Sequence, residues 1–393
     1  MLKVARIGDL GVIYTGNTPS KRKNEYYESN DIMFIKPDIM SFDIEKVNES
    51  NEYISEKARE KARIVPKNSL LVSCIGNIGK LAINIKEASF NQQINAIVHN
   101  ENIISSKYLA YLLKYNQKKL EAIANAPIVP IINKTQFSNF EVYIHENLDI
   151  QENIVEVLDK AQELIDKRKE QIEALDELVK SRFIEMFGDP IKNSSGWRIE
   201  KLEKISSVGS SKRVFVDELV ESGIPFYRGT EIGALSIGNN ITPTLFITEE
   251  HYNSLKKSTG VPVMGDLLMP SICPDGRIWC VNTEESFYFK DGRVLWIHLE
   301  KQYINSVYLK HMLKEKFIRD YNKIASGTTF SELKIFALKA LDIMIPPLGL
   351  QNQFSDFVKQ VDKLKLKMEA NLKELEDNFN SLMQKAFKGE LFN

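Results

Sequence analysis

The sequence predicts an α+β protein built from two duplicated α/β domains joined by two long antiparallel coiled-coil helices, with approximate two-fold symmetry. Two observations carry this prediction. An apolar heptad series recurs at an offset of 200 residues, and fainter strand and helix patterns repeat before each copy. A chain of 393 residues, 43% of them hydrophobic, is also long enough for more than one core. The predicted globular domains are 1–149 and 190–349, and the predicted spacer helices are 150–189 and 350–393.

Each globular block follows the same order of elements. Several strands come first, then a helix over 106–125 or 305–325, then an irregular stretch, and then an alternating strand over 140–144 or 341–345. The long helix follows. Proline and glycine end the elements, because neither continues a regular helix or central strand well. The repeated order predicts that the two blocks share one fold.

Each long helix carries apolar residues at alternating spacings of four and three, the heptad pattern of a coiled coil. The seam positions are Ile154, Leu158, Ile165, Ile172, Leu175 and Val179 in the first helix, and Phe354, Val358, Val361, Leu372, Leu375 and Phe379 in the second. Helices of about 37 residues are about 55 Å long at ~1.5 Å per residue. Antiparallel packing is predicted, since it lets the block between the helices begin and end at one place.

Identical residues support the register of the two helices. They are Gln151 and Gln351, Leu164 and Leu364, Lys167 and Lys367, Leu175 and Leu375, Ser181 and Ser381, and Phe187 and Phe387. One amphipathic helix would be unremarkable in a protein of this size. Two helices in one register at a constant offset indicate duplication.

Composition excludes several classes of protein. No apolar run approaches the ~18 residues of a membrane span, so a soluble cytoplasmic protein is expected. The cysteines Cys74, Cys273 and Cys280 form no CxxC pair, and the five histidines form no HxxxH pair. These patterns predict neither a disulfide framework nor a metal site.

The charges are distributed unevenly along the chain. The net charge is −1, which argues against a strongly basic nucleic-acid binder. Segment 150–189 has 6 Lys and Arg residues against 11 Asp and Glu residues, while the two globular blocks are slightly basic. The acidic face of the first long helix repels DNA, and we expect it to suit a protein surface instead.

Short motifs accompany the repeat. They are Gly16-Asn17-Thr18-Pro19-Ser20, Phe90-Asn91-Gln92-Gln93, Ser222-Gly223-Ile224-Pro225-Phe226-Tyr227-Arg228, Ser326-Gly327-Thr328-Thr329, and Ile345-Pro346-Pro347-Leu348 with Gln351. With the duplicated module and its long helix, this order resembles the specificity (S) subunit of type I restriction-modification systems. The resemblance covers nearly the whole chain. It implies that 1–149 and 190–349 are target-recognition domains, each reading half of a bipartite site in double-stranded DNA.

The resemblance also implies partners. The two helices are similar to the spacer regions that set the half-site separation and dock two copies of a DNA methyltransferase subunit. Some complexes add restriction subunits. No glycine-rich cofactor loop, Walker loop or catalytic constellation is found in the sequence. The chain is therefore expected to be non-catalytic and to bind no cofactor of its own, with S-adenosylmethionine held by the methyltransferase subunits.

Candidate DNA contacts are the cations and hydroxyls of matched loops, because Lys and Arg neutralise phosphates and read base edges. They are Lys21, Arg22, Lys23, Lys36, Lys80, Lys212, Arg213, Arg228, Arg277, Thr328 and Thr329. Lys36 and Arg228 match across the repeat, as do Lys80 and Arg277. Solvated surface, structural ion pairs and, for the threonines, turn chemistry are the alternatives.

Two other functions fit the same sequence. The chain could be the specificity subunit of a different DNA-modification or phage-defence assembly with the same architecture. It could also be a coiled-coil scaffold whose duplicated heads bind proteins, since those heads are nearly neutral. Salt-dependent binding to duplex DNA separates the scaffold from the DNA-binding alternatives, because phosphate contacts impose a steep salt slope.

Overall fold

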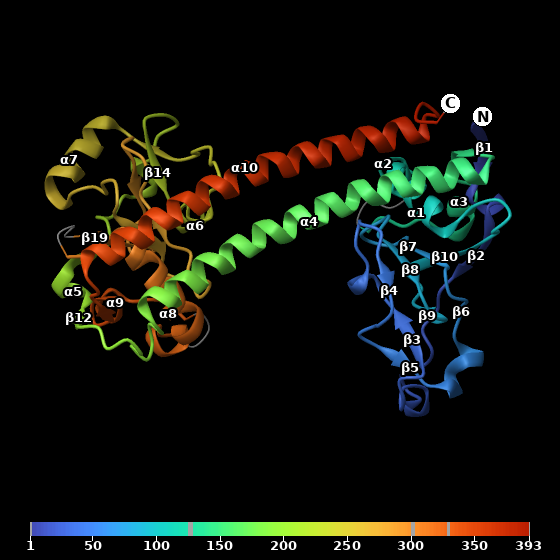
Figure 1. Ribbon diagram of the computed structural model, residues 1–393, viewed down its shortest axis with the longest axis horizontal. Coiled ribbons are helices and arrows are strands. Elements are labelled where there is room, and N and C mark those ends of the chain that lie inside the picture. The colour runs from blue at the N-terminus through green and yellow to red at the C-terminus, as the bar shows by residue number, and fades with distance from the viewer. Residues whose placement is uncertain (1, 125–128, 300–302, 328–330, 393) are drawn as a thin grey trace. The chain divides into compact units, whose positions relative to one another are not determined.

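The computed structural model describes residues 2–124, 129–299, 303–327 and 331–392 (Figure 1). Its contacts divide the chain into two units. Unit 1 comprises Met1–Lys169 and Ala370–Asn393, and unit 2 comprises Glu170–Glu369. Each unit holds one globular block and half of each long helix. The division falls within the helices because the first half of α4 and the last half of α10 pack against the first block, while the other two halves pack against the second.

The long helices are α4 (Leu148–Phe187) and α10 (Leu348–Phe387), each of 40 residues. In unit 1 the first half of α4 packs on the last half of α10, where Leu158 and Phe379 share one core. In unit 2 the last half of α4 packs on the first half of α10, where Val179 and Val358 share another. The pairing is therefore antiparallel, as predicted.

The block of unit 1 is a mixed array of strands with short helices. Its strands are β1 (Leu2–Arg6), β2 (Gly11–Thr15), β3 (Ile32–Ile35), β4 (Lys46–Val47), β5 (Tyr53–Ile54), β6 (Ile64–Val65), β7 (Leu70–Ser73), β8 (Leu81–Asn84), β9 (Ala88–Phe90), β10 (Ile94–His99) and β11 (Glu141–His145). Its helices are α1 (Ser106–Tyr115), α2 (Gln117–Ala122) and α3 (Lys134–Ser138). The sheets have the orders β2-β10-β7-β8-β4, β5-β3-β9-β6 and β1-β11.

The block of unit 2 repeats this plan with five α-helices, against three in the described residues of the first block. Its strands are β12 (Ile199–Lys201), β13 (Ser206–Gly209), β14 (Ile224–Tyr227), β15 (Phe246–Ile247), β16 (Leu267–Pro270), β17 (Trp279–Cys280), β18 (Tyr288–Phe289), β19 (Val294–Leu299) and β20 (Asp342–Met344). Its helices are α5 (Leu202–Ile205), α6 (Gly229–Ser236), α7 (Glu249–Thr259), α8 (Ser306–Ile324) and α9 (Ile335–Lys339). The sheets have the orders β13-β19-β16-β17, β15-β14-β18 and β12-β20.

A matched polar contact ties each long helix to its block. In unit 1 the buried amide of Gln151 donates through Nε2 to the carbonyl of His145 at 2.8 Å. In unit 2 Gln351 donates in the same way to the carbonyl of Pro346 at 2.8 Å. A buried amide group that lacks a hydrogen bond is destabilising. The matched bond therefore fixes where each long helix begins relative to its block.

Both helices predicted within the blocks are interrupted. The expected helix over 106–125 is two helices, α1 and α2, which meet at Asn116. The side-chain amide of Asn116 donates to the carbonyl of Leu112 at 2.9 Å, and such local bonds compete with a regular helix. The corresponding helix of unit 2, α8, is also interrupted, because Asp320 has the non-helical angles φ −129° and ψ 17° and kinks it. Within the described ranges, no helix is long and apolar enough to span a membrane.

Candidate nucleic-acid interface

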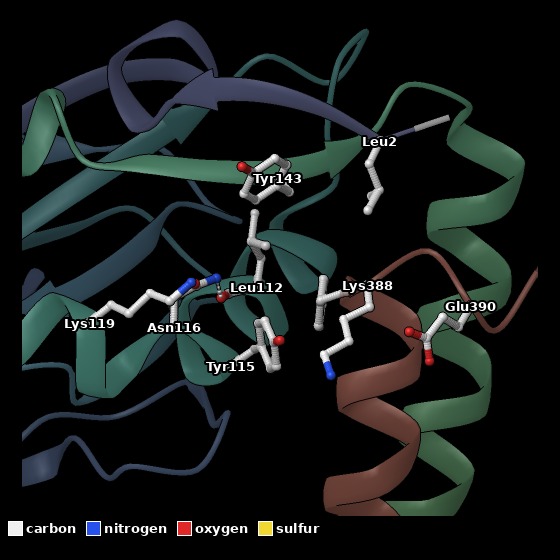
Figure 2. Close-up of a pocket in the computed structure, with 9 residues that line it drawn as sticks. Leu2, Leu112, Tyr115, Asn116, Lys119, Tyr143, Lys388 and Glu390 are labelled. Carbon is white, nitrogen blue, oxygen red and sulfur yellow. Dashed lines mark hydrogen bonds between the residues drawn. The ribbon is translucent and has the colours of Figure 1, made fainter.

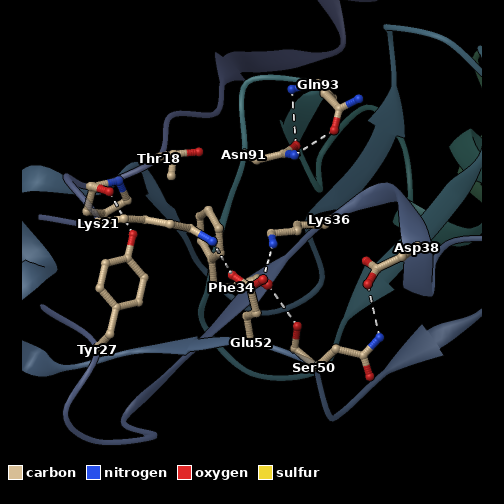
Figure 3. Close-up of polar contacts among 12 residues, drawn as sticks. Thr18, Lys21, Tyr27, Phe34, Lys36, Asp38, Ser50, Glu52, Asn91 and Gln93 are labelled. Atoms are coloured by element: carbon tan, nitrogen blue, oxygen red, sulfur yellow. Dashed lines mark hydrogen bonds and ion pairs between the residues drawn. The ribbon is translucent and has the colours of Figure 1, made fainter. Parts of the chain in front are cut away.

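Two candidate lysines of unit 1 meet at one carboxylate (Figure 3). Lys36 follows β3 and forms a short ion pair with Glu52. Lys21 reaches the other oxygen of Glu52 at 3.5 Å from the loop after β2. The hydrogen bond from Lys36, followed by the charges of both lysines, holds the pKa of Glu52 below its usual value. Glu52 stays ionised and offsets one of the two positive charges, leaving this cluster with one net positive charge.

A third candidate, Lys80, joins the same region. Its Nζ donates to the carbonyl of Pro37 at 3.1 Å, one residue beyond Lys36. The structure thus brings Lys21, Lys36 and Lys80 around a single turn that follows β3. Glu52 offsets one of these three charges, and the positive charge that remains suits a phosphate backbone.

The motif loop over 16–20 is held firmly beside these lysines. Asn17 donates to the carbonyl of Lys61 and accepts from the backbone of Arg63, both at 2.6 Å. The hydroxyl of Thr18 donates to the side-chain oxygen of Gln92 at 2.9 Å. The hydrogen bond from Thr18 uses only the oxygen of the Gln92 side-chain amide. Glutamine side-chain amides can form hydrogen bonds with the edge of an adenine base. The sequence identifies Asn17 and Thr18 only as part of a motif, and their long-range hydrogen bonds show what they do in this loop.

Arg22 and Lys23 differ from the clustered lysines. Both side chains are exposed. Lys23 lies over the ring of Tyr26, 5.2 Å from its centroid, and 3.9 Å from Glu25. Arg22 forms no ion pair with any residue that the structure describes. Its charge is therefore the most available of the unit 1 candidates.

Arg228 occupies the position in unit 2 that Lys36 occupies in unit 1, directly after the matching strand. It starts α6 and is tied to Glu231 by several hydrogen bonds, one of 2.6 Å. Burial acts to raise the pKa of Glu231, but the hydrogen bonds from Arg228 and Thr230 outweigh it and lower the pKa to about 2. Glu231 already neutralises the Arg228 side chain, and its carboxylate also accepts from the backbone N–H of Arg228 at the start of α6.

Arg277 is also engaged locally. Its Nε lies 2.7 Å from Asp275, and its guanidinium packs against Gly233 of α6, where a Cβ would approach Nη1 to 3.1 Å. Lys80 and Arg277 thus occupy matching positions in the repeat, but their side chains contact different partners. Arg228 and Arg277 both support α6, which favours the structural alternative for these two residues.

Lys212 and Arg213 lie on an exposed loop after β13. The backbone N–H of Lys212 donates to the hydroxyl of Tyr288 at 2.9 Å, and Arg213 donates to Asp291 at 3.0 Å. The ammonium of Lys212 has no ion-pair partner among the described residues. Among the candidate DNA contacts that the structure describes, Lys212 is therefore a cation of unit 2 without an ion pair, as Arg22 is in unit 1. Thr328 and Thr329 lie outside the described residues.

The predicted seam residues line the contacts between the helices and their blocks. Nine are buried: Ile154, Leu158, Ile165, Leu175, Val179, Phe354, Val358, Val361 and Phe379. Ile172, Leu372 and Leu375 are half-buried. Charged residues in the seam find partners across it: Arg168 donates to Asn371, and Lys365 donates to Asp176 at 2.8 Å.

A separate hollow of about 460 Å³ lies in unit 1 beside β1 and β11 (Figure 2). Leu2 and Tyr143 line it from the strands, Tyr115 from α1, and Lys388 from the end of α10. None of the candidate DNA contacts lines it. This hollow is therefore distinct from the positive cluster at Glu52.

The reactive groups of the described residues give no sign of a catalytic centre. Burial raises the pKa of the Cys74 thiol to about 12 and that of Cys273 to about 12, so both remain protonated and unreactive. Within the described ranges, no three His, Cys, Asp or Glu side chains are placed to hold a metal ion.

Comparisons with known proteins agree over nearly the full length. A family model described as the type I restriction modification DNA specificity domain matches residues 2–175 and 195–377. A type I restriction enzyme specificity subunit of Methanocaldococcus jannaschii is 27% identical over 99% of this chain and 93% of its own length. One from Escherichia coli is 30% identical over 39% of each chain.

Solved structures share the fold. A chain from a study of complex assembly and conformational transition of the type I restriction-modification system aligns over 99% of this chain and 98% of its own, with a TM-score of 0.67 and 16% identity. The type I restriction-modification S subunit from M. genitalium aligns over 98% of this chain and 96% of its own, with a TM-score of 0.53 and 16% identity.

Proposed function

The chain belongs to the type I restriction-modification DNA specificity family, and we propose that units 1 and 2 each read one half of a bipartite DNA site. The duplication of one scaffold at a constant offset carries this proposal. Two modules with different surface loops should recognise two unrelated short sequences separated by a gap of unspecified bases. Arg22 and the Glu52 cluster would contact DNA in unit 1, and the Lys212 loop would do so in unit 2.

The long helices supply a docking surface for protein partners. Leu164 and Leu364 occupy the same register position, and their exposed fractions are 55% and 47%. Exposed leucines on helices whose seams are already filled favour contact with further helices. Because the two leucines are equivalent, we propose that one chain docks two copies of a DNA methyltransferase subunit.

Catalysis would then reside in those partners. The methyltransferase subunits would hold S-adenosylmethionine and the target adenine, and this chain would bind no cofactor. Restriction subunits would join where the system includes them. The whole assembly would work in the cytoplasm, where it meets both host and incoming DNA.

Exchange of one module tests the bipartite reading. Residues 190–349 would be replaced by the second module of a relative with a different target, and methylated sites would be mapped by sequencing the genome of cells that carry each version. We expect one half-site to change and the other to stay. A single uninterrupted target, or a change in both halves, would contradict the proposal.

Insertion of one heptad at the same register position in both helices tests whether they set the spacing. Seven residues lengthen the pair by about 10 Å, about three base pairs at ~3.4 Å each, and keep the seam facing inward. We expect the gap between half-sites to grow by about three base pairs. An insertion of four residues is the control, because it turns the seam outward and should prevent folding. An unchanged gap would show that the partners set the distance.

A further inference from the structure

Unit 2 contains a pocket of about 450 Å³ on the outer side of the β13–β19 strand pair. Trp296 and His298 of β19 and Ser207 and Gly209 of β13 line one side. The end of α7 and the following Val261 line the other. The cross-strand register pairs Ser207 with His298 and Gly209 with Trp296, so the four residues lie on one face of the sheet.

Asp266, which is 1% exposed, orients the side chains of Trp296 and His298 through hydrogen bonds. It accepts from Nε1 of Trp296 at 2.8 Å and bonds Nδ1 of His298 at 2.9 Å. The contact fits the tautomer that carries its hydrogen on Nδ1, which donates to a carboxylate oxygen of Asp266. The second ring nitrogen, Nε2, bonds no residue that the structure describes. The imidazole is thus oriented with one polar atom unused at the pocket.

Gly209 and Gly260 leave open space beside the indole ring of Trp296 because neither has a side chain. A Cβ at Gly209 would meet no atom within 4 Å, so the position opposite Trp296 is open. Gly260 ends α7 with a φ of +79°, and a Cβ there would lie 3.5 Å from the indole edge. Larger residues at these two places would fill the pocket. The hydroxyl of Ser207 is exposed near His298 and, like Nε2, has no partner among the described residues.

The equivalent face of unit 1 has none of these groups. At the offset of 200 residues, Ala96 replaces Trp296 and Val98 replaces His298. Val12 stands opposite Val98, where Ser207 stands opposite His298. Ser69, which precedes the central strand as Asp266 does, bonds the carbonyl of Pro66 at 2.7 Å instead. The scaffold therefore does not require this constellation, because unit 1 forms the same strands without it.

We propose that the pocket binds one unstacked nucleobase, with its face against Trp296 and its edge bonded to His298 Nε2 and the Ser207 hydroxyl. An aromatic surface beside a few oriented polar atoms is how proteins hold single bases. The backbone of the Lys212 loop reaches the pocket wall. The Tyr288 hydroxyl lies 3.2 Å from the Thr259 hydroxyl on this wall and accepts from the backbone N–H of Lys212, and this loop would bind the attached phosphate. This inference rests on the proposed function, and the base could belong to a DNA strand or to a free nucleotide.

Binding by the full-length chain tests the assignment. Each of the four deoxynucleoside monophosphates, a paired duplex, and the same duplex with one unpaired nucleotide would be titrated while tryptophan fluorescence is followed. We expect at least one monophosphate, or the duplex with the unpaired nucleotide, to quench fluorescence and to bind about tenfold more tightly than its paired control or the other monophosphates. Binding of the unpaired duplex alone identifies DNA as the source, and binding of a monophosphate alone identifies a free nucleotide.

His298→Ala and Ser207→Ala should each reduce this binding about tenfold, while the matched unit 1 variant Val98→Ala should not. Ser207 is exposed, so its variant keeps the test valid if the histidine variant folds poorly. Equal affinity of wild type and both variants for every probe would overturn the pocket assignment. If the paired duplex still binds with a steep salt slope, the proposed function survives that result. Loss of monophosphate binding in the variants, without any duplex binding by the wild type, would support the pocket and contradict the proposed function.

Discussion

Units 1 and 2 share buried residues at an offset of 200 positions, whereas their candidate DNA contacts are held by different partners. Tyr108 and Tyr308 are both fully buried, and Gln151 and Gln351 tie their helices in the same way. Outside the core the units diverge. Lys36 shares Glu52 with a second lysine, whereas Arg228 is confined to its own helix cap. Buried residues such as Tyr108 and Tyr308 are constrained because they pack against the long helices. Residues outside the core, such as Lys36 and Arg228, can differ because each unit would recognise a different DNA sequence.

The largest expected difference concerns the aromatic residue near the end of each helix. Phe187 is enclosed by the rings of Phe183, Tyr308 and Phe354, at centroid distances of 4.7 to 5.5 Å. Phe387 packs against the rings of Tyr108 and Tyr115, at centroid distances of 5.4 and 5.3 Å, but it also lines the hollow beside β1 and β11. Phe187→Ala should destabilise unit 2 by about 5 kcal/mol, and Phe387→Ala should destabilise unit 1 by about 3 kcal/mol, because water can enter the second cavity.

Amide hydrogen exchange, measured separately for peptides of each unit, checks this prediction. Each substitution should accelerate exchange mainly in its own unit. Equal losses of protection, or a larger loss for Phe387→Ala, would mean that the two aromatic sites are energetically equivalent. Leu366→Ala is the control, because Leu366 is 67% exposed and its truncation should change little.

The response to acid should also separate the units. His311 takes the place of Tyr111 and packs edge-on against Phe354. Burial, with smaller contributions from Lys310 and Lys314, lowers the pKa of His311 to about 3. The unfolded chain binds this proton more readily, so the stabilisation present above pH 6.5 is lost as pH falls towards 3. The loss is at most about 1.4 kcal/mol per pH unit.

Unfolding of wild type and His311→Tyr at pH 7 and pH 4.5 checks the acid response. The tyrosine is the residue that unit 1 carries, and it does not titrate in this range. We expect the wild type to lose more stability than the variant between the two pH values, with the difference confined to unit 2. Parallel losses in both proteins would show that His311 does not govern the acid response.

The smallest expected effects concern DNA affinity. Arg22→Ala and Lys212→Ala should each lower the slope of log affinity against log salt by about one, because each removes a free cation. Arg228→Ala should leave the slope unchanged, since Glu231 already neutralises that charge. Glu52→Gln should raise the slope by about one, because it releases a lysine charge. Titrations of one duplex at several salt concentrations measure all four, and a reduced slope for Arg228→Ala would show that its ion pair opens on DNA.

The architecture could be predicted from the sequence because it depends on local periodicity. The helices α4 and α10 begin two residues before their predicted starts at 150 and 350. A heptad pattern identifies a buried stripe without knowledge of what buries it. The break at Asn116 was missed, because nothing in the helical pattern marks an asparagine whose side chain bonds its own helix.

The sequence by itself determined the duplication, the antiparallel helices and which loops carry positive charge. Only the tertiary structure decided which of those charges are free. Glu52 lies 16 residues from Lys36, and Asp266 lies 32 residues from His298, yet each pair is in contact. Such contacts depend on strand register and on loop conformation. A register shift of one residue would give every side chain of the strand a different partner. The order of polar and apolar side chains along the chain therefore predicts the helices and strands, whereas contacts between distant segments determine which side chains meet at a binding site.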